Sequence, residues 1–368
     1  MLSKDRLFAP SVVLLVLLAI SSSNVRGETA SASANPPDRP FQELYDQGVD
    51  RYLGVFVPTV TERLMGNVVK YQFVGGDGPL CFTGNEFSMY TRDGASEELM
   101  IFLQGGGACG LTSCEAVDFP LPIVSLGILD PRNAANPAAN FDLGYIPYCD
   151  GTLFSGDREV DSNGDGSNDR FFRGIQNLSA ALDVIASTYP APRRILLVGN
   201  SAGGLGVHYA LPLVRKLYPE VPIDLVNDSG IGIQQPGAQE SLIDYWNSAG
   251  FFPASCSSCI GDDGNLTNYY KYQLAEDENV RMGFISSTRD EVVIGRTMID
   301  GAEFEAQLTA AMAELEQAYP DRFRSLVSDT EEHTFVIKQF GFAVANTTVL
   351  QWITDMLSQS DDWVSASD

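Results

Sequence analysis

Residues 193–209 read RRILLVGNSAGGLGVHY and combine three local patterns. Residues 195–198 are apolar and mostly leucine, isoleucine or valine, as in a strand buried on both faces. A glycine-flanked turn follows directly, and apolar residues at helical spacing come after it. This is the setting in which a Gly-x-Ser-x-Gly turn exposes a reactive serine. We therefore predict that Ser201 is a nucleophile, the alternative being an ordinary strand-to-helix turn.

A serine hydroxyl needs a neighbouring base to react near neutral pH, and the chain contains two histidines. His208 falls two turns into the same expected helix as Ser201, where it would pack or cap rather than reach the hydroxyl. His333 follows the last expected strand of the sheet, where an α/β hydrolase carries its base. We predict His333 as the base.

The carboxylate that orients the base is expected to lie between the serine and the histidine in the chain. Asp290 follows an expected strand and gives the order Ser, Asp, His. Asp228 also ends an expected strand and is the alternative. Asp329 and Glu332, close to His333, are expected to be solvated loop charges.

The expected strand at residues 98–104 runs directly into three glycines, Gly105 to Gly107. Backbone N–H groups in such a run can face outward and stabilise a developing oxyanion. We predict donors at Gly107, Ala108 and Ala202, and an acyl-serine intermediate that requires no cofactor. A flexible glycine turn is the alternative.

Strands and helices alternate along the rest of the chain. The expected strands cover residues 67–73, 81–92, 98–104, 142–149, 195–198, 223–226, 281–287 and 323–327. The expected helices cover residues 174–188, 202–217, 241–249, 268–276, 304–319 and 348–358. This alternation predicts an α/β fold with a mainly parallel central sheet flanked by helices on both faces.

The first 40 residues have a different character. Basic Lys4 and Arg6, apolar residues 11–20 and a polar segment resemble a secretory signal peptide, predicted over residues 1–27. An uncleaved anchor is the alternative. Residues 28–40 are expected to be a disordered tether, and residues 41–368 a single esterase domain. We expect a secreted protein, extracellular or in the periplasm or cell envelope, without stable membrane insertion after signal removal.

Six cysteines in an exported chain indicate three disulfide bonds. Spacing pairs Cys109 with Cys114 and Cys256 with Cys259, which leaves Cys81 for Cys149. A zinc site, or a redox-active pair in the CSSC segment, are the alternatives.

The formal net charge of −25 disfavours nucleic acid as a partner. It also weighs against tight binding of a charged polyuronate without a local basic patch. Residues 161–169 read DSNGDGSND, and their spacing matches part of a calcium-binding loop. The candidate ligands for a structural Ca²⁺ are Asp161, Asn163, Asp165 and Asp169. Phe172 replaces the usual twelfth-position glutamate and the flanking segments look like strands, so we expect a hairpin tip that holds Ca²⁺ rather than a regular EF-hand, the alternative being only a polar turn.

Four segments in matching order resemble the pectin acetylesterase/Notum family: GGGAC at residues 105–109, YCDGTLFSGD at 148–157, FRG at 172–174 and GNSAGG at 199–204. The resemblance implies an α/β-hydrolase fold and carboxylester hydrolysis. It carries over Ser201, Asp290 and His333 as the triad, and the disulfides Cys81–Cys149 and Cys109–Cys114.

This chain departs from the family at two positions of the site: Ala108 replaces a usual Trp, and Asn200 a usual Cys. Residues 161–169 look like an insertion. We predict a monomeric serine esterase that removes O-acetyl groups from a polysaccharide such as pectin, or that acts on another small ester. The alternatives are a Notum-like deacylase or general esterase for longer acyl chains, and a non-catalytic glycan-binding module on a hydrolase scaffold.

Overall fold

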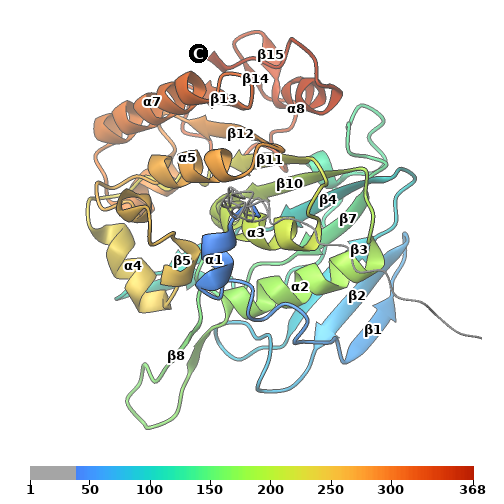
Figure 1. The fold of residues 1–368 in the computed structure, drawn as a ribbon, viewed down its shortest axis with the longest axis vertical. Helices are drawn as coiled ribbons and strands as arrows, with labels where there is room; N and C mark the ends of the chain where they lie inside the picture. Colours follow the sequence, from blue (N-terminus) through green and yellow to red (C-terminus); the bar gives the residue numbers. More distant parts are fainter. Residues whose placement is uncertain (1–38) are drawn as a thin grey trace, which may run out of the picture. The chain divides into compact units, whose positions relative to one another are not determined.

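A ten-stranded sheet runs through residues 39–368, the part of the chain that this computed structural model describes (Figure 1). The predicted signal peptide and nearly all of the predicted tether lie outside these residues. The strands, in spatial order, are β1 (Val60–Arg63), β2 (Val68–Phe73), β3 (Phe87–Arg92), β7 (Asp142–Ile146), β4 (Glu98–Leu103), β10 (Arg194–Asn200), β11 (Ile223–Asp228), β12 (Val280–Ser287), β13 (Phe323–Ser328) and β16 (Ala366–Ser367).

From β7 to β16 all neighbouring strands pair in parallel, whereas β1, β2 and β3 join antiparallel at one edge. The central strand β10 is buried on both faces, because Ile195 and Leu197 enter one apolar cluster and Leu196 and Val198 enter another. This double burial explains the continuous apolar run that predicted the strand.

Helices cover both faces of the sheet. The first apolar cluster receives side chains from α2 (Gly174–Thr188), α3 (Ala202–Leu217), α5 (Thr267–Glu276) and α7 (Gly301–Ala318). The second receives side chains from α8 (Val349–Ser358). This is the predicted α/β-hydrolase fold, with a mainly parallel sheet between helical layers.

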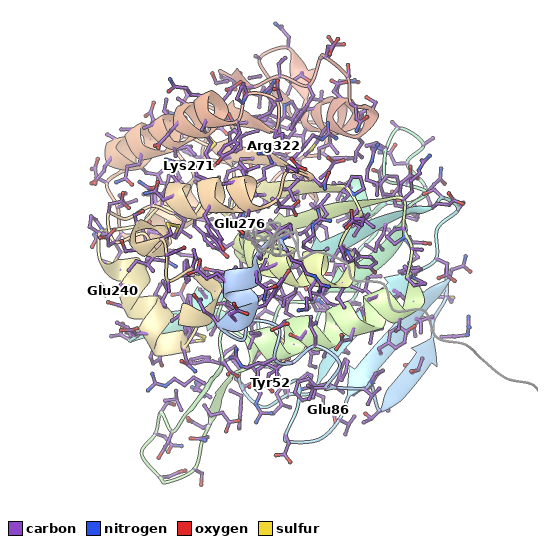
Figure 2. All side chains as sticks on the ribbon, viewed as in Figure 1. Tyr52, Glu86, Glu240, Lys271, Glu276 and Arg322 are labelled. Carbon is purple, nitrogen blue, oxygen red and sulfur yellow. A yellow bond between two sulfur atoms is a disulfide. The ribbon has the colours of Figure 1, made fainter. Side chains whose placement is uncertain are left out.

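Short helices, 3₁₀ turns and two-stranded sheets lie in the segments that connect the strands and helices above. They are α1 (Gln42–Asp46), α4 (Ala238–Trp246), α6 (Glu291–Thr297), the 3₁₀ turns η1 (Gly127–Leu129), η2 (Ala249–Phe251) and η3 (Ser257–Ile260), and the two-stranded sheets β5 (Gly107–Cys109)/β6 (Cys114–Ala116), β8 (Arg158–Val160)/β9 (Arg170–Phe172) and β14 (Ala343–Val344)/β15 (Thr347–Thr348). Side chains join neighbouring helices as well: Lys271 on α5, labelled in Figure 2, pairs with Glu314 on α7 at 2.6 Å.

One predicted strand is shorter than expected. Residues 81–92 were expected to be extended throughout, but β3 begins only at Phe87. The preceding residues form a turn in which Gly84 has φ +88° and Cys81 N–H donates to Asn85 O. Cys81 is also bonded to Cys149, which holds this turn against the segment that follows β7.

The three disulfides are Cys81–Cys149, Cys109–Cys114 and Cys256–Cys259, as predicted. All six cysteines lie within residues 39–368 and are paired with one another, so no thiolate remains to bind zinc. Over the same residues, no helix is long and apolar enough to cross a membrane.

Candidate active site

Ser201 occupies a sharp turn between β10 and α3. Its φ of 55° and ψ of −119° are an unusual, strained combination for a residue with a side chain. The flanking glycines permit the turn, since a Cβ on Gly199 would lie 2.0 Å from Gly203 O, and one on Gly203 would lie 2.0 Å from Leu103 O. The Ser201 N–H donates to Asp228 O at 2.7 Å, which fixes the turn to the next strand.

His333 lies between Ser201 and Asp290 in one line of hydrogen bonds. Its Nε2 is 2.8 Å from Ser201 Oγ, and its Nδ1 is 2.7 Å from Asp290 Oδ2. A carboxylate only accepts hydrogen bonds, so Asp290 favours the imidazole tautomer with the proton on Nδ1. Nε2 is then free to accept the serine proton.

Asp290 is fully buried and is held in place by a short helix. It is the N-cap of α6, and its Oδ1 accepts the N–H groups of Val292 and Val293, both at 3.0 Å. N–H groups at a helix start favour a carboxylate there. The sequence carried a signal for this helix, because an aspartate before an apolar run is a typical helix start.

The other candidate residues make different contacts. His208 is fully buried, with Nδ1 2.7 Å from Gln273 Oε1, and burial lowers its pKa to about 3. It is therefore a neutral packing residue. Asp228 does not contact the imidazole of His333 but accepts N–H groups from the chain beyond it. Asp329 pairs with Arg289 at the surface.

The predicted oxyanion donors differ in orientation. In the β5–β6 ladder Ala108 lies opposite Glu115. Hydrogen-bonded and non-hydrogen-bonded pairs alternate along an antiparallel ladder. The pairs two positions away on either side are hydrogen-bonded, since Val117 N–H donates to Gly106 O and Gly110 N–H to Ser113 O, so Ala108 and Glu115 form a hydrogen-bonded pair as well. The Ala108 N–H is thus directed at Glu115 O. The same alternation directs the Gly107 N–H away from β6. Ala202 begins α3, where N–H groups have no partner within the helix.

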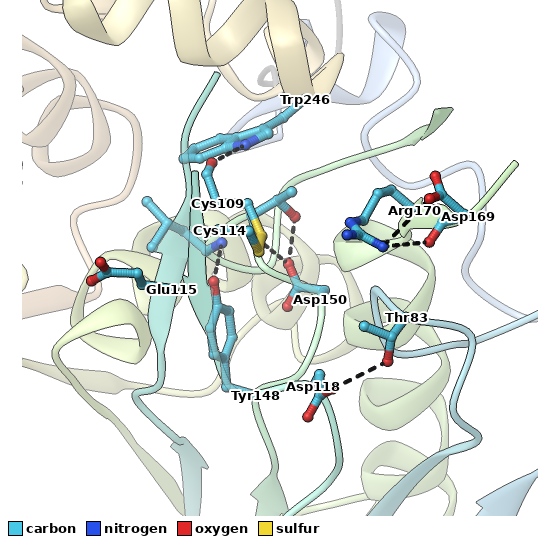
Figure 3. The surroundings of a disulfide bond; sticks show 12 residues. Thr83, Cys109, Cys114, Glu115, Asp118, Tyr148, Asp150, Asp169, Arg170 and Trp246 are labelled. Carbon is cyan, nitrogen blue, oxygen red and sulfur yellow. Dashed lines mark hydrogen bonds and ion pairs between the residues drawn. A yellow bond between two sulfur atoms is a disulfide. The ribbon is translucent and has the colours of Figure 1, made fainter. Parts of the chain in front are cut away.

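The β5–β6 hairpin is anchored by hydrogen bonds to distant parts of the chain (Figure 3). Trp246 Nε1–H donates to Cys109 O at 2.9 Å, and Cys109 N–H donates to Gly151 O at 2.7 Å. The ring of Tyr148 lies so close to Gly106 that a Cβ there would be 2.5 Å from Tyr148 Cδ1. Tyr148, part of the segment at residues 148–157 that resembles the family, therefore packs against the loop of Gly105 to Gly107, which we call the glycine loop. Nothing in the spacing of the sequence indicated the contribution of Trp246.

Residues 161–169 form the tip of the β8–β9 hairpin, as predicted, and project away from the sheet (Figure 1). Asp161 accepts N–H groups from Gly164 and Gly166, and Asp169 accepts that of Ser162. Within residues 39–368, no group of three or more His, Cys, Asp and Glu side chains is arranged to hold a metal ion. Ca²⁺ binding at this tip stays a prediction.

The fold and the Ser–His–Asp arrangement at the carboxyl ends of β10, β12 and β13 are those of an α/β hydrolase. Residues 65–249 match the Pectinacetylesterase family model, and the chain belongs to this family.

Several curated relatives carry related names. Similarity to palmitoleoyl-protein carboxylesterase notum2 of Xenopus laevis is 26% identity over 44% of this chain and 36% of that protein. Similarity to pectin acetylesterase 4 of Arabidopsis thaliana is 28% identity over 42% of this chain and 41% of that protein. Palmitoleoyl-protein carboxylesterase notum1' of Xenopus laevis is 26% identical over 59% of this chain and 50% of its own length. The chain thus spans about a third to a half of the length of these three relatives.

Proposed function

We propose that this chain is a serine carboxylesterase in which Ser201 is the nucleophile, His333 the general base and Asp290 the orienting carboxylate. The observation that carries the proposal is the continuous hydrogen-bonded line from Ser201 Oγ through both nitrogens of His333 to Asp290. A strained serine turn beside that line supports the same function, because strain of this kind collects at catalytic sites.

The reaction follows from the geometry. His333 Nε2 takes the Ser201 proton as Oγ bonds to the ester carbonyl carbon, and the carbonyl oxygen becomes negative. The N–H groups of Gly107 and Ala202 would stabilise this oxygen. His333 then returns the proton to the departing alcohol, leaving an acyl-serine. Water, deprotonated by His333, releases the acid and restores Ser201. These steps need no metal or organic cofactor.

We propose an O-acetyl ester, such as that of an acetylated polysaccharide, as the first substrate class to test. The family name and a relative named pectin acetylesterase support it. A longer acyl chain is the second candidate, supported by relatives named palmitoleoyl-protein carboxylesterases. The non-catalytic binding module from the sequence analysis remains the outcome if no ester is cleaved.

Export to an oxidising compartment is part of the proposal. Three disulfides support it, because such bonds persist outside the reducing cytosol. The basic, apolar and polar order at the start of the sequence supports it as well. We also propose that the protein acts as a monomer.

The test is hydrolysis of 4-nitrophenyl acetate and longer 4-nitrophenyl esters by the full chain and by Ser201→Ala. We expect Ser201→Ala to lose essentially all turnover and to resist a fluorophosphonate probe. Ser179→Ala is the matched control, since Ser179 is a buried serine on α2 and is expected to leave turnover unchanged. Full turnover in a folded Ser201→Ala protein would refute the mechanism.

A further inference from the structure

A second buried carboxylate lies beside the proposed triad, at the end of β11. Asp228 is 0% exposed, and its Oδ2 accepts the Phe335 N–H at 2.8 Å and the Val336 N–H at 2.9 Å. The neighbouring Ser229 Oγ accepts the Thr334 N–H at 3.1 Å. Three successive N–H groups, directly after His333, therefore point at two adjacent side chains.

Successive N–H groups of this kind form a concave anion-binding site in proteins. Here the anion is part of the same chain. Thr334 has φ 69°, a left-handed conformation that is unfavourable for a residue with a branched side chain. Such a conformation persists only where surrounding contacts hold it, and the contacts at this bend are those of Asp228 and Ser229.

The backbone of Asp228 holds the opposite side of the site. Its carbonyl oxygen accepts the Ser201 N–H at 2.7 Å, and Asp228 lies opposite Asn200 in the parallel register of β10 and β11. One residue thus contacts the serine turn through its main chain and the histidine loop through its carboxylate.

We infer that Asp228 is a positioning residue, whose carboxylate holds the loop after His333 so that Nε2 stays within hydrogen-bond reach of Ser201 Oγ. This inference rests on the proposed esterase function. It gives the second carboxylate a role different from that of Asp290, which contacts the imidazole itself. Burial raises the pKa of Asp228 to about 6, because the ionised carboxylate is less stable away from water.

Asp224 is the matched control on the same strand. It is 3% exposed, lies near the start of β11, and pairs with Arg281 at 2.7 Å. Replacing it also disturbs a buried carboxylate of β11, but at the end of the strand away from Ser201. A general loss of packing or charge would therefore lower kcat in variants of both residues, whereas loss of positioning would lower kcat only in the Asp228 variants.

The experiment compares Asp228→Asn, Asp228→Leu and Asp224→Asn with the unchanged protein. Asparagine keeps one acceptor oxygen and leucine keeps none. Because a misplacement of about 1 Å can cost about 100-fold in rate, we expect kcat for 4-nitrophenyl acetate to fall about 10-fold in Asp228→Asn and about 100-fold in Asp228→Leu. KM should stay within about twofold, and Asp224→Asn should keep kcat within about twofold.

Hydrogen exchange supplies a readout that does not depend on turnover. The N–H groups of Phe335 and Val336 should lose protection in Asp228→Leu, lose only part of it in Asp228→Asn, and keep it in Asp224→Asn. Unchanged protection, or an active parent enzyme with unchanged kcat in Asp228→Leu, would overturn the inference. Lost protection together with a parent protein that cleaves no ester would instead refute the proposed function and leave Asp228 as the residue that holds this loop.

Discussion

Replacing Gly105 by alanine is expected to damage catalysis through sterics alone. Gly105 follows the strand end at β4, and its N–H donates to Asn200 Oδ1 at 3.1 Å. An added Cβ would lie 2.5 Å from Asn200 O and 2.9 Å from Ser201 Cβ. Its φ does not lie in the left-handed region, so the substitution introduces no backbone strain of its own. The clash falls between the glycine loop and the serine turn.

The size of the effect follows from these distances. The contact with Asn200 O must open by about 0.9 Å to reach the 3.4 Å of an ordinary contact. Either the serine turn moves away from His333, or the loop that carries Gly107 moves away from the serine. Losing one oxyanion donor costs about 100- to 1,000-fold in kcat, or about 2.7–4 kcal/mol. A misplacement of about 1 Å costs about 100-fold. We therefore expect kcat to fall at least about 100-fold.

The assay is steady-state hydrolysis of 4-nitrophenyl acetate, with the melting temperature measured in parallel. Gly76→Ala is the matched control, because a Cβ there meets nothing within 4 Å and the site lies in the turn between β2 and β3. It should retain kcat within about twofold. A folded Gly105→Ala protein with kcat equal to that of Gly76→Ala would refute the assignment of this loop to the site.

Three further predictions concern pH, calcium and the hairpin anchor. Protonated Asp228, whose pKa is raised from 3.8 to about 6, stabilises the fold fully below about pH 3.8 and no longer well above pH 6. As the pH rises from 4 to 7 in denaturant titrations, the free energy of unfolding of the parent should therefore fall by about 2 kcal/mol relative to that of Asp228→Asn; a pH-independent difference contradicts this. Calorimetry is expected to show Ca²⁺ binding that Asp161→Ala abolishes, whereas no heat and no thermal shift would leave residues 161–169 a polar turn. Trp246→Phe, which leaves Cys109 O without its donor, should lower stability by about 1–3 kcal/mol in the same titrations, and an unchanged midpoint would contradict that anchor.

Much of the site could be predicted because few residues could fill each role. With two histidines in the chain, and one of them on the helix after Ser201, the base was nearly determined by elimination. Parallel strands end at one edge of the sheet, so the residues after β10, β12 and β13 were expected to meet there. The structure brings Ser201, Asp290 and His333 together at that edge.

The rest depends on contacts that no local pattern encodes. The direction of the Ala108 N–H follows from pairing with Glu115, and no local pattern indicated that the glycine run would continue into a hairpin. The support from Trp246 spans 137 residues. Asp228 was correctly recognised as a strand-end carboxylate, but only the fold of the histidine loop distinguishes it from Asp290.

The wide separation of Ser201 and His333 also affects the order of events during synthesis. These two residues meet across 132 positions, and the family match ends at residue 249, before either Asp290 or His333. A nascent chain that has completed β10 and β11 contains Ser201, the proposed nucleophile, but neither the proposed base His333 nor the proposed orienting carboxylate Asp290. The contact between Ser201 and His333 can form only after β12 and β13 have joined the sheet. Contacts between residues far apart in the sequence form slowly, as is typical of parallel sheets. Under the proposed mechanism, turnover of a simple ester would therefore report that the chain has folded as far as His333, and a chain that lacks β12 and β13 would cleave no ester.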